Sequence, residues 1–294
     1  MALKHVMFVL AAVSVPVYVL FLGTIVRFRR RQPFRSPFFQ ISFVLGVVDV
    51  TNILNMWLLN KFPGYGWMGM DVFVRKWPTT LAKISKTLAF WAGFAGCFSV
   101  SVMAFNRLTN LAFPLRHQLV GIPAIIVAPM LFTDFDYQII NGTIRGVPFL
   151  DPIYHKIYYK LGFLSTAAAS VVCVSMYSFM IVKLQRSSVE PEKQATAQRA
   201  KPSEQIRQVE RKMAVFGFAM VVMNVCLTLY MILMNSTTDT NALATYRVWY
   251  TVLIDVYNWI NPWLVLALSD VVRGHFKAFV LCTPLPTSLA VPTR

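Results

Sequence analysis

The chain has 294 residues, of which 56% are apolar and only 14% are charged, and its mean hydropathy is +0.56. A soluble domain carries about 45–50% apolar and about 25% charged residues, so this composition excludes an ordinary soluble fold and also intrinsic disorder. The formal net charge of +16 would suggest nucleic acid in a soluble protein. Here the basic residues lie between apolar runs, which indicates a membrane protein and no nucleic-acid partner.

Apolar segments that are long enough to cross a lipid bilayer dominate the chain. A membrane-spanning helix needs about 20 largely apolar residues. We predict an all-α membrane protein, a seven-transmembrane helix bundle that forms a single domain over residues 1–294. The predicted spans are residues 6–26, 38–60, 87–105, 119–133, 158–182, 213–235 and 248–268. The fourth is short, and Pro123 and Pro129 leave its ends undefined by the pattern.

Residues 6–26 have some features of a signal peptide, but their pattern favours an uncleaved first span. The apolar stretch is longer than a signal peptide's, and the basic run RFRRRQPFR at 27–35 follows it instead of preceding it. This run also resists transfer across the membrane, so it predicts that the first span is followed by a cytoplasmic loop.

The distribution of lysine and arginine predicts the orientation of the bundle. With the N-terminus outside, the inward segments 27–35, 106–118, 183–212 and 269–294 hold 18 basic residues and the outward segments hold 10. Cytoplasmic loops are enriched in Lys and Arg, so we expect an external N-terminus and a cytoplasmic tail at 269–294. Both N-x-S/T sequons, at Asn141 and Asn235, fall on the predicted outer side and are candidate glycosylation sites. Asn235 lies very close to the membrane.

The hydrophilic segment 183–212 is the long cytoplasmic loop of this arrangement. Its last part, Glu204 to Lys212, is predicted to extend the sixth helix. The chain shows no internal repeat, which counts against an inverted-repeat transporter.

Ionisable and amide side chains inside the spans are the anomalies that a bilayer should not tolerate. Asp49 lies in the second span, with Asn52 one helical turn later. From the helix rise, Asp49 lies about 16 Å, and Asn258 and Asn261 about 15 and 10 Å, from the cytoplasmic face. We therefore expect a shared polar cluster that acts as a switch. The alternative, that amides such as Asn52 and Asn258 only hold helices together, stays open.

The seventh span combines a polar stripe with a proline. Asp255, Asn258 and Asn261 recur at helical spacing, and Pro262 frees a backbone carbonyl and bends the helix. Such a hinge beside a hydrated polar core suits two packings of similar energy. Asp255 lies nearer the outer face, where it would meet either a ligand or a structural hydrogen bond.

Two segments resemble the cytoplasmic side of G-protein-coupled receptors. In SVSVMAFNRLTNLAFPLRH, residues 99–117, Asn106-Arg107 ends a helix and Pro114 follows seven residues after the arginine, with Arg116 beyond it. In NPWLVLALSDVVRGHFKAF, residues 261–279, an Asn-Pro element precedes an amphipathic helix. Cys282, just after it, is a candidate palmitoylation site, and an unmodified tail cysteine is the alternative.

Within these receptors, the chain is similar to the nematode serpentine chemoreceptors of the gamma superfamily. It resembles class gamma most and class V next. The resemblance rests on residues 16–50, on NRLT…FP at 106–114 and on NPWLVLALS…R..F at 261–276. It implies an external small-molecule ligand, a heterotrimeric G protein and the plasma membrane, with sensory cilia as the site in chemosensory neurons. The chain departs from the rhodopsin-like pattern: span six lacks a Cys-Trp-x-Pro element, and span seven has no lysine for a retinal Schiff base.

This resemblance assigns roles to particular residues. The residues implied in G-protein coupling are Asn106, Arg107, Pro114 and Arg116. The ligand would bind among the outer halves of the helices, where the candidates are Trp91, Tyr159, Tyr230, Trp249 and Asp255. The alternative is that the aromatic residues form the belt that many membrane proteins place at the bilayer interface, and that the basic residues only hold loops inside.

Two other classes of function compete with the receptor. An ion channel or transporter would use Asp49 and Asp255 to line a path, and it would carry current without a G protein. A membrane enzyme is disfavoured because the four histidines (His5, His117, His155 and His275) are scattered and no HExxH motif occurs. The sequence predicts no metal and no cofactor.

Overall fold

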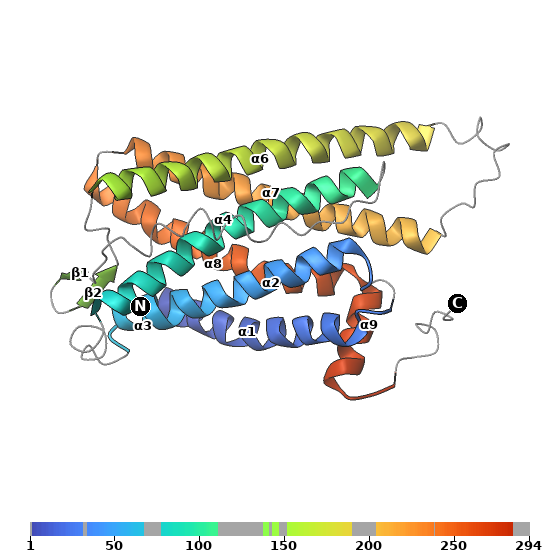
Figure 1. Cartoon of the computed structure of the whole chain (residues 1–294), viewed down its shortest axis with the longest axis horizontal. Coiled ribbons are helices and arrows are strands. Elements are labelled where there is room, and N and C mark those ends of the chain that lie inside the picture. The colour runs from blue at the N-terminus through green and yellow to red at the C-terminus, as the bar shows by residue number, and fades with distance from the viewer. Residues whose placement is uncertain are drawn as a thin grey trace.

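The protein is a bundle of long helices (Figure 1). The computed structural model describes residues 2–31, 34–67, 78–110, 138–140, 143–146, 152–189, 204–237 and 239–284. The long helices are α1 (Ala2–Phe28), α2 (Pro37–Asn55), α4 (Pro78–Asn110), α6 (Pro152–Val189), α7 (Glu204–Ser236) and α8 (Thr240–Leu268). The second of these continues through a π-helical segment, η1 (Met56–Lys61), and the short α3 (Phe62–Gly64). The only strands in the described part, β1 (Gln138–Ile140) and β2 (Thr143–Gly146), form one small antiparallel hairpin.

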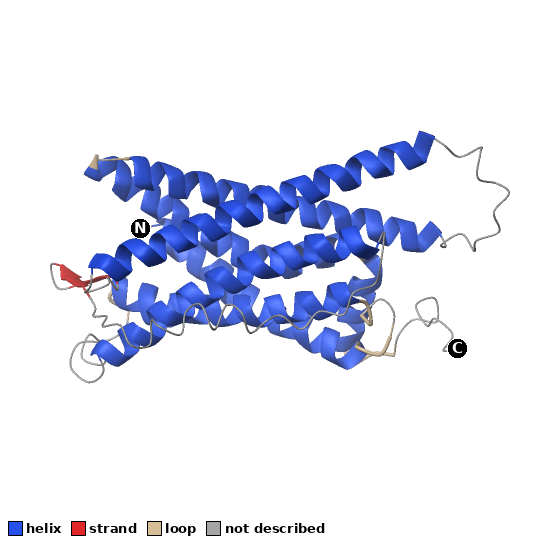
Figure 2. Cartoon of the chain, turned by 45° about the horizontal axis from the view of Figure 1, so that its top comes forward, coloured by secondary structure: helices blue, strands red, loops and turns tan. Residues whose placement is uncertain are grey.

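Six stretches of these helices are long and apolar enough to cross a membrane. They are Leu3–Phe28, Phe38–Gly64, Thr79–Phe105, Ile157–Phe179, Val215–Met234 and Thr245–Leu268. They correspond to six of the seven predicted spans, and the predicted all-helical bundle is confirmed. The predicted fourth span, 119–133, lies outside the described residues. Helix α4 ends at the same end of the bundle as α9, whereas the β1–β2 hairpin lies at the opposite end (Figures 1 and 2).

Two predicted boundaries differ from the structure. The third span was predicted to begin at 87, but α4 begins at Pro78, because the helix continues through Lys83 and Lys86 to the bundle's end. Lys86 lies over the rings of Phe90 and Tyr159, each 5.6 Å away, so its charge is accommodated at the helix end. The predicted extension of the sixth helix from Glu204 is confirmed by α7.

The second span runs past its predicted end at residue 60, and six residues near that end, Met56–Lys61, are π-helical. In η1 the hydrogen bonds widen, so that the N–H of Phe62 donates to the carbonyl of Trp57, five residues back. Pro63 follows, and it has no N–H to offer the carbonyl four residues before it. A wider turn beside a proline accommodates that missing bond and rotates the side chains beyond it relative to a regular α-helix.

The helices pack as a closed ring in sequence order. Helix α2 packs against α1 and α4, α4 packs against α6, α6 against α7, and α7 against α8, which returns to α1 and α2. The interior is filled by large side chains such as Tyr18, Phe21, Leu45 and Phe216. Large apolar side chains also cover the outside of the bundle, which suits a surface that faces lipid.

A short helix, α9 (Asp270–Val280), lies across one end of the bundle (Figure 1). This is the predicted amphipathic helix after the seventh span. We call the end of the bundle at which α1 begins the N-terminal end, and the opposite end the α9 end.

Candidate functional site

A buried chain of polar side chains joins three helices in the middle of the bundle. The hydroxyl of Tyr18 on α1 donates to the carboxylate of Asp49 on α2. The amide of Asn261 on α8 donates to the same Tyr18 oxygen at 3.0 Å. All three side chains are buried. The structure thus brings together two of the residues predicted for the polar cluster, Asp49 and Asn261, and joins them through a tyrosine.

Close packing of α1 against α2 makes this chain possible. Gly46 lies one turn before Asp49, and a Cβ there would stand 2.6 Å from Leu22 and 3.0 Å from the ring of Tyr18. The two backbones can approach because no side chain intervenes, and the tyrosine hydroxyl then reaches the carboxylate. Gly46 is therefore a packing requirement of the Tyr18–Asp49 contact.

The remaining members of the predicted switch surround this chain. Asn52 and Asn258 are both buried, and the side-chain oxygen of Asn52 has no hydrogen-bond partner within the described part of the chain. The side-chain oxygen of Asn261 also has no hydrogen-bond partner among the described residues. Pro262 lies inside α8, where it leaves the backbone carbonyl of Asn258 without its usual donor. The interior therefore holds more acceptors than the described donors satisfy.

A buried ion pair lies on α8 closer to the N-terminal end. The ammonium of Lys61 in η1 donates to the carboxylate of Asp255, and their side chains are only 8% and 4% exposed. Sequence reasoning counted Lys61 with the loop that follows the second span. The structure corrects this, because the span continues through η1 and places Lys61 inside the bundle.

A third polar contact joins α6 to α7. Asn224 donates to the hydroxyl of Ser170 at 2.9 Å and to the carbonyl of Thr166 at 3.4 Å, and Thr228 lies 3.2 Å from Ser170. This pattern is typical of polar groups that hold membrane helices together. Asn224 was missed by the sequence analysis, although an amide in the middle of an apolar run is the signal that would have found it.

The predicted ligand residues occupy different environments. Trp91 packs against Val48, Ala92 and Ala95, and Tyr230 is half-buried. Tyr159 and Trp249 are 41% and 49% exposed, as side chains of an interfacial belt would be. Asp255 alone among them is buried, and it is paired with Lys61.

Of the four predicted coupling residues, the structure places two, Asn106 and Arg107, at the α9 end. Asn106 and Arg107 lie in the last turns of α4, which ends at Asn110. Pro114 and Arg116 lie outside the described residues. Of the glycosylation candidates, Asn235 lies in the last turn of α7, and Asn141 lies between β1 and β2, outside the described residues.

Helix α9 is fixed to the bundle by a capped start and a buried ring. Ser269 caps its N-terminus by accepting from the N–H of Val272 at 3.3 Å. His275 packs edge-on against Phe28 and Phe34, at 5.0 and 5.2 Å between ring centroids. Burial lowers the pKa of His275 below its usual value, which favours a neutral ring there.

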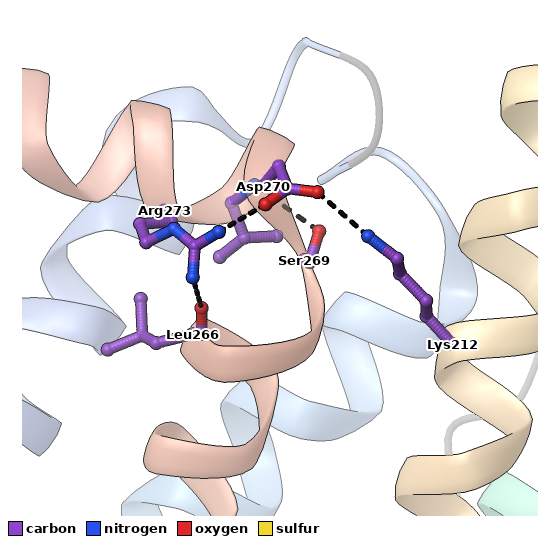
Figure 3. Close-up of polar contacts among 6 residues, drawn as sticks. Lys212, Leu266, Ser269, Asp270 and Arg273 are labelled. Carbon is purple, nitrogen blue, oxygen red and sulfur yellow. Dashed lines mark hydrogen bonds and ion pairs between the residues drawn. The ribbon is translucent and has the colours of Figure 1, made fainter.

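An exposed cluster of charges links α9 to α7 (Figure 3). Lys212 on α7 donates to Asp270 at 2.7 Å, and Arg273 donates to the same carboxylate and to the carbonyl of Leu266. The hydrogen bond from Lys212, aided by the charges of Lys212 and Arg273, lowers the pKa of Asp270 below its usual value. This cluster fixes the first turns of α7 to the start of α9.

Cys282, two residues after the end of α9, has a backbone conformation that usually requires glycine. Its φ is +51°, its N–H bonds the carbonyl of Phe279, and the N–H of Thr283 bonds that of Ala278 at 3.1 Å. These two bonds form a Schellman motif, in which a left-handed residue follows the helix. The Cys282 side chain is exposed.

Comparison with known proteins gives two matches over nearly the whole chain. Residues 7–282 match the family described as serpentine type 7TM GPCR chemoreceptor Srv. The chain is also similar to serpentine receptor class V-1 of Caenorhabditis elegans, with 22% identity in an alignment that covers 93% of this chain and 89% of that protein. Both matches agree with the resemblance to nematode serpentine chemoreceptors, and both are to class V, the second of the two classes named from the sequence.

Proposed function

Because the chain belongs to the Srv family of serpentine seven-transmembrane chemoreceptors, we propose that it binds an external small-molecule ligand and signals through a heterotrimeric G protein. In this proposal it is a multi-pass protein of the plasma membrane, in the cilia of sensory neurons. The N-terminal end faces outward, and α9 lies on the cytoplasmic side with the tail.

The observation that carries the proposal is the buried Tyr18–Asp49–Asn261 chain. It links α1, α2 and α8 by side-chain hydrogen bonds at mid-membrane, where polar groups are costly and mark function. It lies beside Pro262, which weakens the backbone of α8 at the same level. A ligand that prefers a second packing of these helices would shift the population toward it.

The signal would leave the molecule at the α9 end. We assign coupling to Asn106 and Arg107 in the last turns of α4, and to Pro114 and Arg116 in the segment after it. Arg107 and Arg116 carry positive charge that complements an acidic surface on a G protein. We propose Asn141 and Asn235 as glycosylation sites on the outer side and Cys282 as a palmitoylation site on the inner side.

The test is a signalling assay on the full chain in a heterologous cell, with a panel of odorants and pheromones and with G protein co-expressed or omitted. Arg107→Ala should abolish ligand-evoked calcium signals while surface expression persists, because it removes the cation that contacts the partner. Arg27→Ala, a basic residue at the end of α1, is the matched control and should signal normally.

Undiminished signalling by Arg107→Ala would refute its role. Current or flux that persists without a G protein would instead favour the channel or transporter that uses Asp49 and Asp255.

A further inference from the structure

Two buried hydrogen-bond donors at the N-terminal end carry more protons than the described residues provide acceptors for. The indole N–H of Trp57 is buried and has no partner within the described residues. The ammonium of Lys61 lies 4.4 Å from the centre of the Trp57 ring, so the two donors share one region. Lys61 carries three protons, and the described structure gives it one acceptor, Asp255. Because buried donors are almost always paired, this site is short of negative oxygen.

Aromatic rings surround these donors and provide an apolar wall. Phe8 and Phe62 lie 5.7 and 5.9 Å from Trp57 between ring centroids, and Tyr65 lies at 6.5 Å. A second cation, Lys4, lies 4.5 Å from the Tyr65 ring. The region therefore combines flat apolar surface with positive charge.

The wider charge at this end has the same sign. The exposed or half-buried cations with described side chains are Lys4, Lys83, Lys86, Lys160 and Arg247, against the exposed carboxylate of Asp239. Over the whole sequence, the predicted outer segments (1–5, 61–86, 134–160 and 236–247) hold ten Lys and Arg against five Asp. Topology alone would deplete basic residues from an outer face, so their excess here needs another cause. A positive potential at the mouth of a site attracts anions.

We infer that Lys61 and Trp57 form the recognition site for the carboxylate of a small organic acid, whose apolar body packs against the aromatic rings. The inference rests on the proposed receptor function and names the chemical class of its ligand. One carboxylate oxygen accepts from the Trp57 indole and the other takes the place of Asp255 at Lys61. No covalent bond to the ligand is made: its carboxylate takes over the ion pair with Lys61, and the released Asp255 carboxylate takes up one proton from solvent, so that no unpaired charge stays buried.

Displacing Asp255 connects recognition to the switch. Asp255 lies on α8, six residues before Asn261, so the ion pair and the Tyr18–Asp49–Asn261 chain both hold the same helix. The Lys61–Asp255 pair fixes α8 to the end of the second span. When the ligand replaces Asp255, this connection is lost, and α8 is free to move about Pro262.

The test measures binding without a G protein, on full-length receptor purified into lipid nanodiscs. The probes are phenylacetate, phenylpropanoate and hexanoate, each paired with its neutral primary amide, and the readout is the shift in thermal unfolding. We expect the acids to stabilise the receptor and the amides to have no effect. Lys61→Met/Asp255→Asn, which leaves no unpaired charge, should lose acid binding, whereas Lys61→Arg should retain it.

Two further variants sharpen the result. Trp57→Phe keeps the ring but removes the N–H, and it should weaken acid binding by about tenfold, the effect of one lost charge-assisted hydrogen bond. Lys212→Met, which removes an exposed lysine at the α9 end, is the matched control and should bind acids normally.

Three outcomes would overturn the inference: amides that stabilise as well as acids, undiminished acid binding by the double variant, or no acid-selective shift across the panel. Acid binding without a cellular signal would support this site and count against the proposed signalling function. Signalling evoked by neutral compounds alone would support the proposed signalling function and count against this site.

Discussion

The chain places the same two residue types, lysine and aspartate, in ion pairs at opposite ends of the bundle. Lys61 and Asp255 meet near the N-terminal end with side chains 8% and 4% exposed. Lys212 and Asp270 meet at the α9 end with side chains 42% and 66% exposed. Both pairs fix the region of α8 and α9 to a neighbouring helix, so the difference between them lies in their surroundings and not in their chemistry.

The difference in burial changes what each pair can do. A buried pair loses its hydration, and its mutual attraction recovers that cost only when both partners stay in place. Removing or replacing one partner is then a large event, as a ligand-operated contact requires. An exposed pair contributes little and is screened by salt, so a protein partner can separate it at small cost. The buried end suits recognition of a small molecule, and the exposed end suits reversible docking.

The largest expected effect comes from removing one member of the buried pair. Lys61→Met leaves Asp255 without its cation inside the bundle, and it should lower the free energy of unfolding by about 3–5 kcal/mol. Lys61→Met/Asp255→Asn should recover most of this loss, because no charge then remains unpaired. The measurement is a double-mutant cycle on unfolding of the purified receptor in a denaturing detergent. A single variant as stable as the double would show that Asp255 does not depend on Lys61.

A middle-sized effect is expected for the Tyr18–Asp49 contact in the middle of the bundle. There the partner of the aspartate is a neutral hydroxyl and not a cation. Tyr18→Phe removes the donor to Asp49 and the acceptor for Asn261 without changing the ring. It should cost about 1–3 kcal/mol, the usual penalty for buried polar groups that lose their partner. Ser14→Ala is the control, since it removes from the same helix a hydroxyl that accepts from Trp263 at 3.2 Å. Equal losses of unfolding free energy in the two variants would mean that the Tyr18–Asp49–Asn261 hydrogen bonds stabilise the bundle no more than the Ser14 hydroxyl does.

The sequence predicts the elements far better than it predicts which side chains meet. Hydropathy located the spans because bilayer thickness fixes the length of an apolar helix. Helix rise also placed Asp49 and Asn261 at comparable depth, and the structure joins them. Tyr18 was missed because an aromatic residue counts as apolar, although its hydroxyl must find a partner when it is buried.

The position of Lys61 could not be read from hydropathy for a different reason. The direction in which the Lys61 side chain points depends on the wide turns of η1. The presence of Pro63 alone does not fix where such turns begin. A regular helix would have turned the side chains after Trp57 differently. The buried pair, and with it the candidate recognition site, therefore depends on a local irregularity that only the structure reveals.

The smallest effect, and the sharpest contrast with the buried pair, is expected for Lys212 and Asp270. The hydrogen bond from Lys212 lowers the pKa of Asp270, so its contribution to stability is present above the ordinary aspartate pKa of about 3.9 and is lost as the pH falls below it. Lys212→Met should therefore change the melting temperature only slightly at neutral pH and not at all in strong acid. About 1 M salt, with a Debye length of about 3 Å, should also remove the difference, whereas the coupling between Lys61 and Asp255 should survive the same salt. A Lys212–Asp270 coupling that resists both acid and salt would mean that this end of the bundle is shielded from water, and the contrast between the two ends would no longer hold.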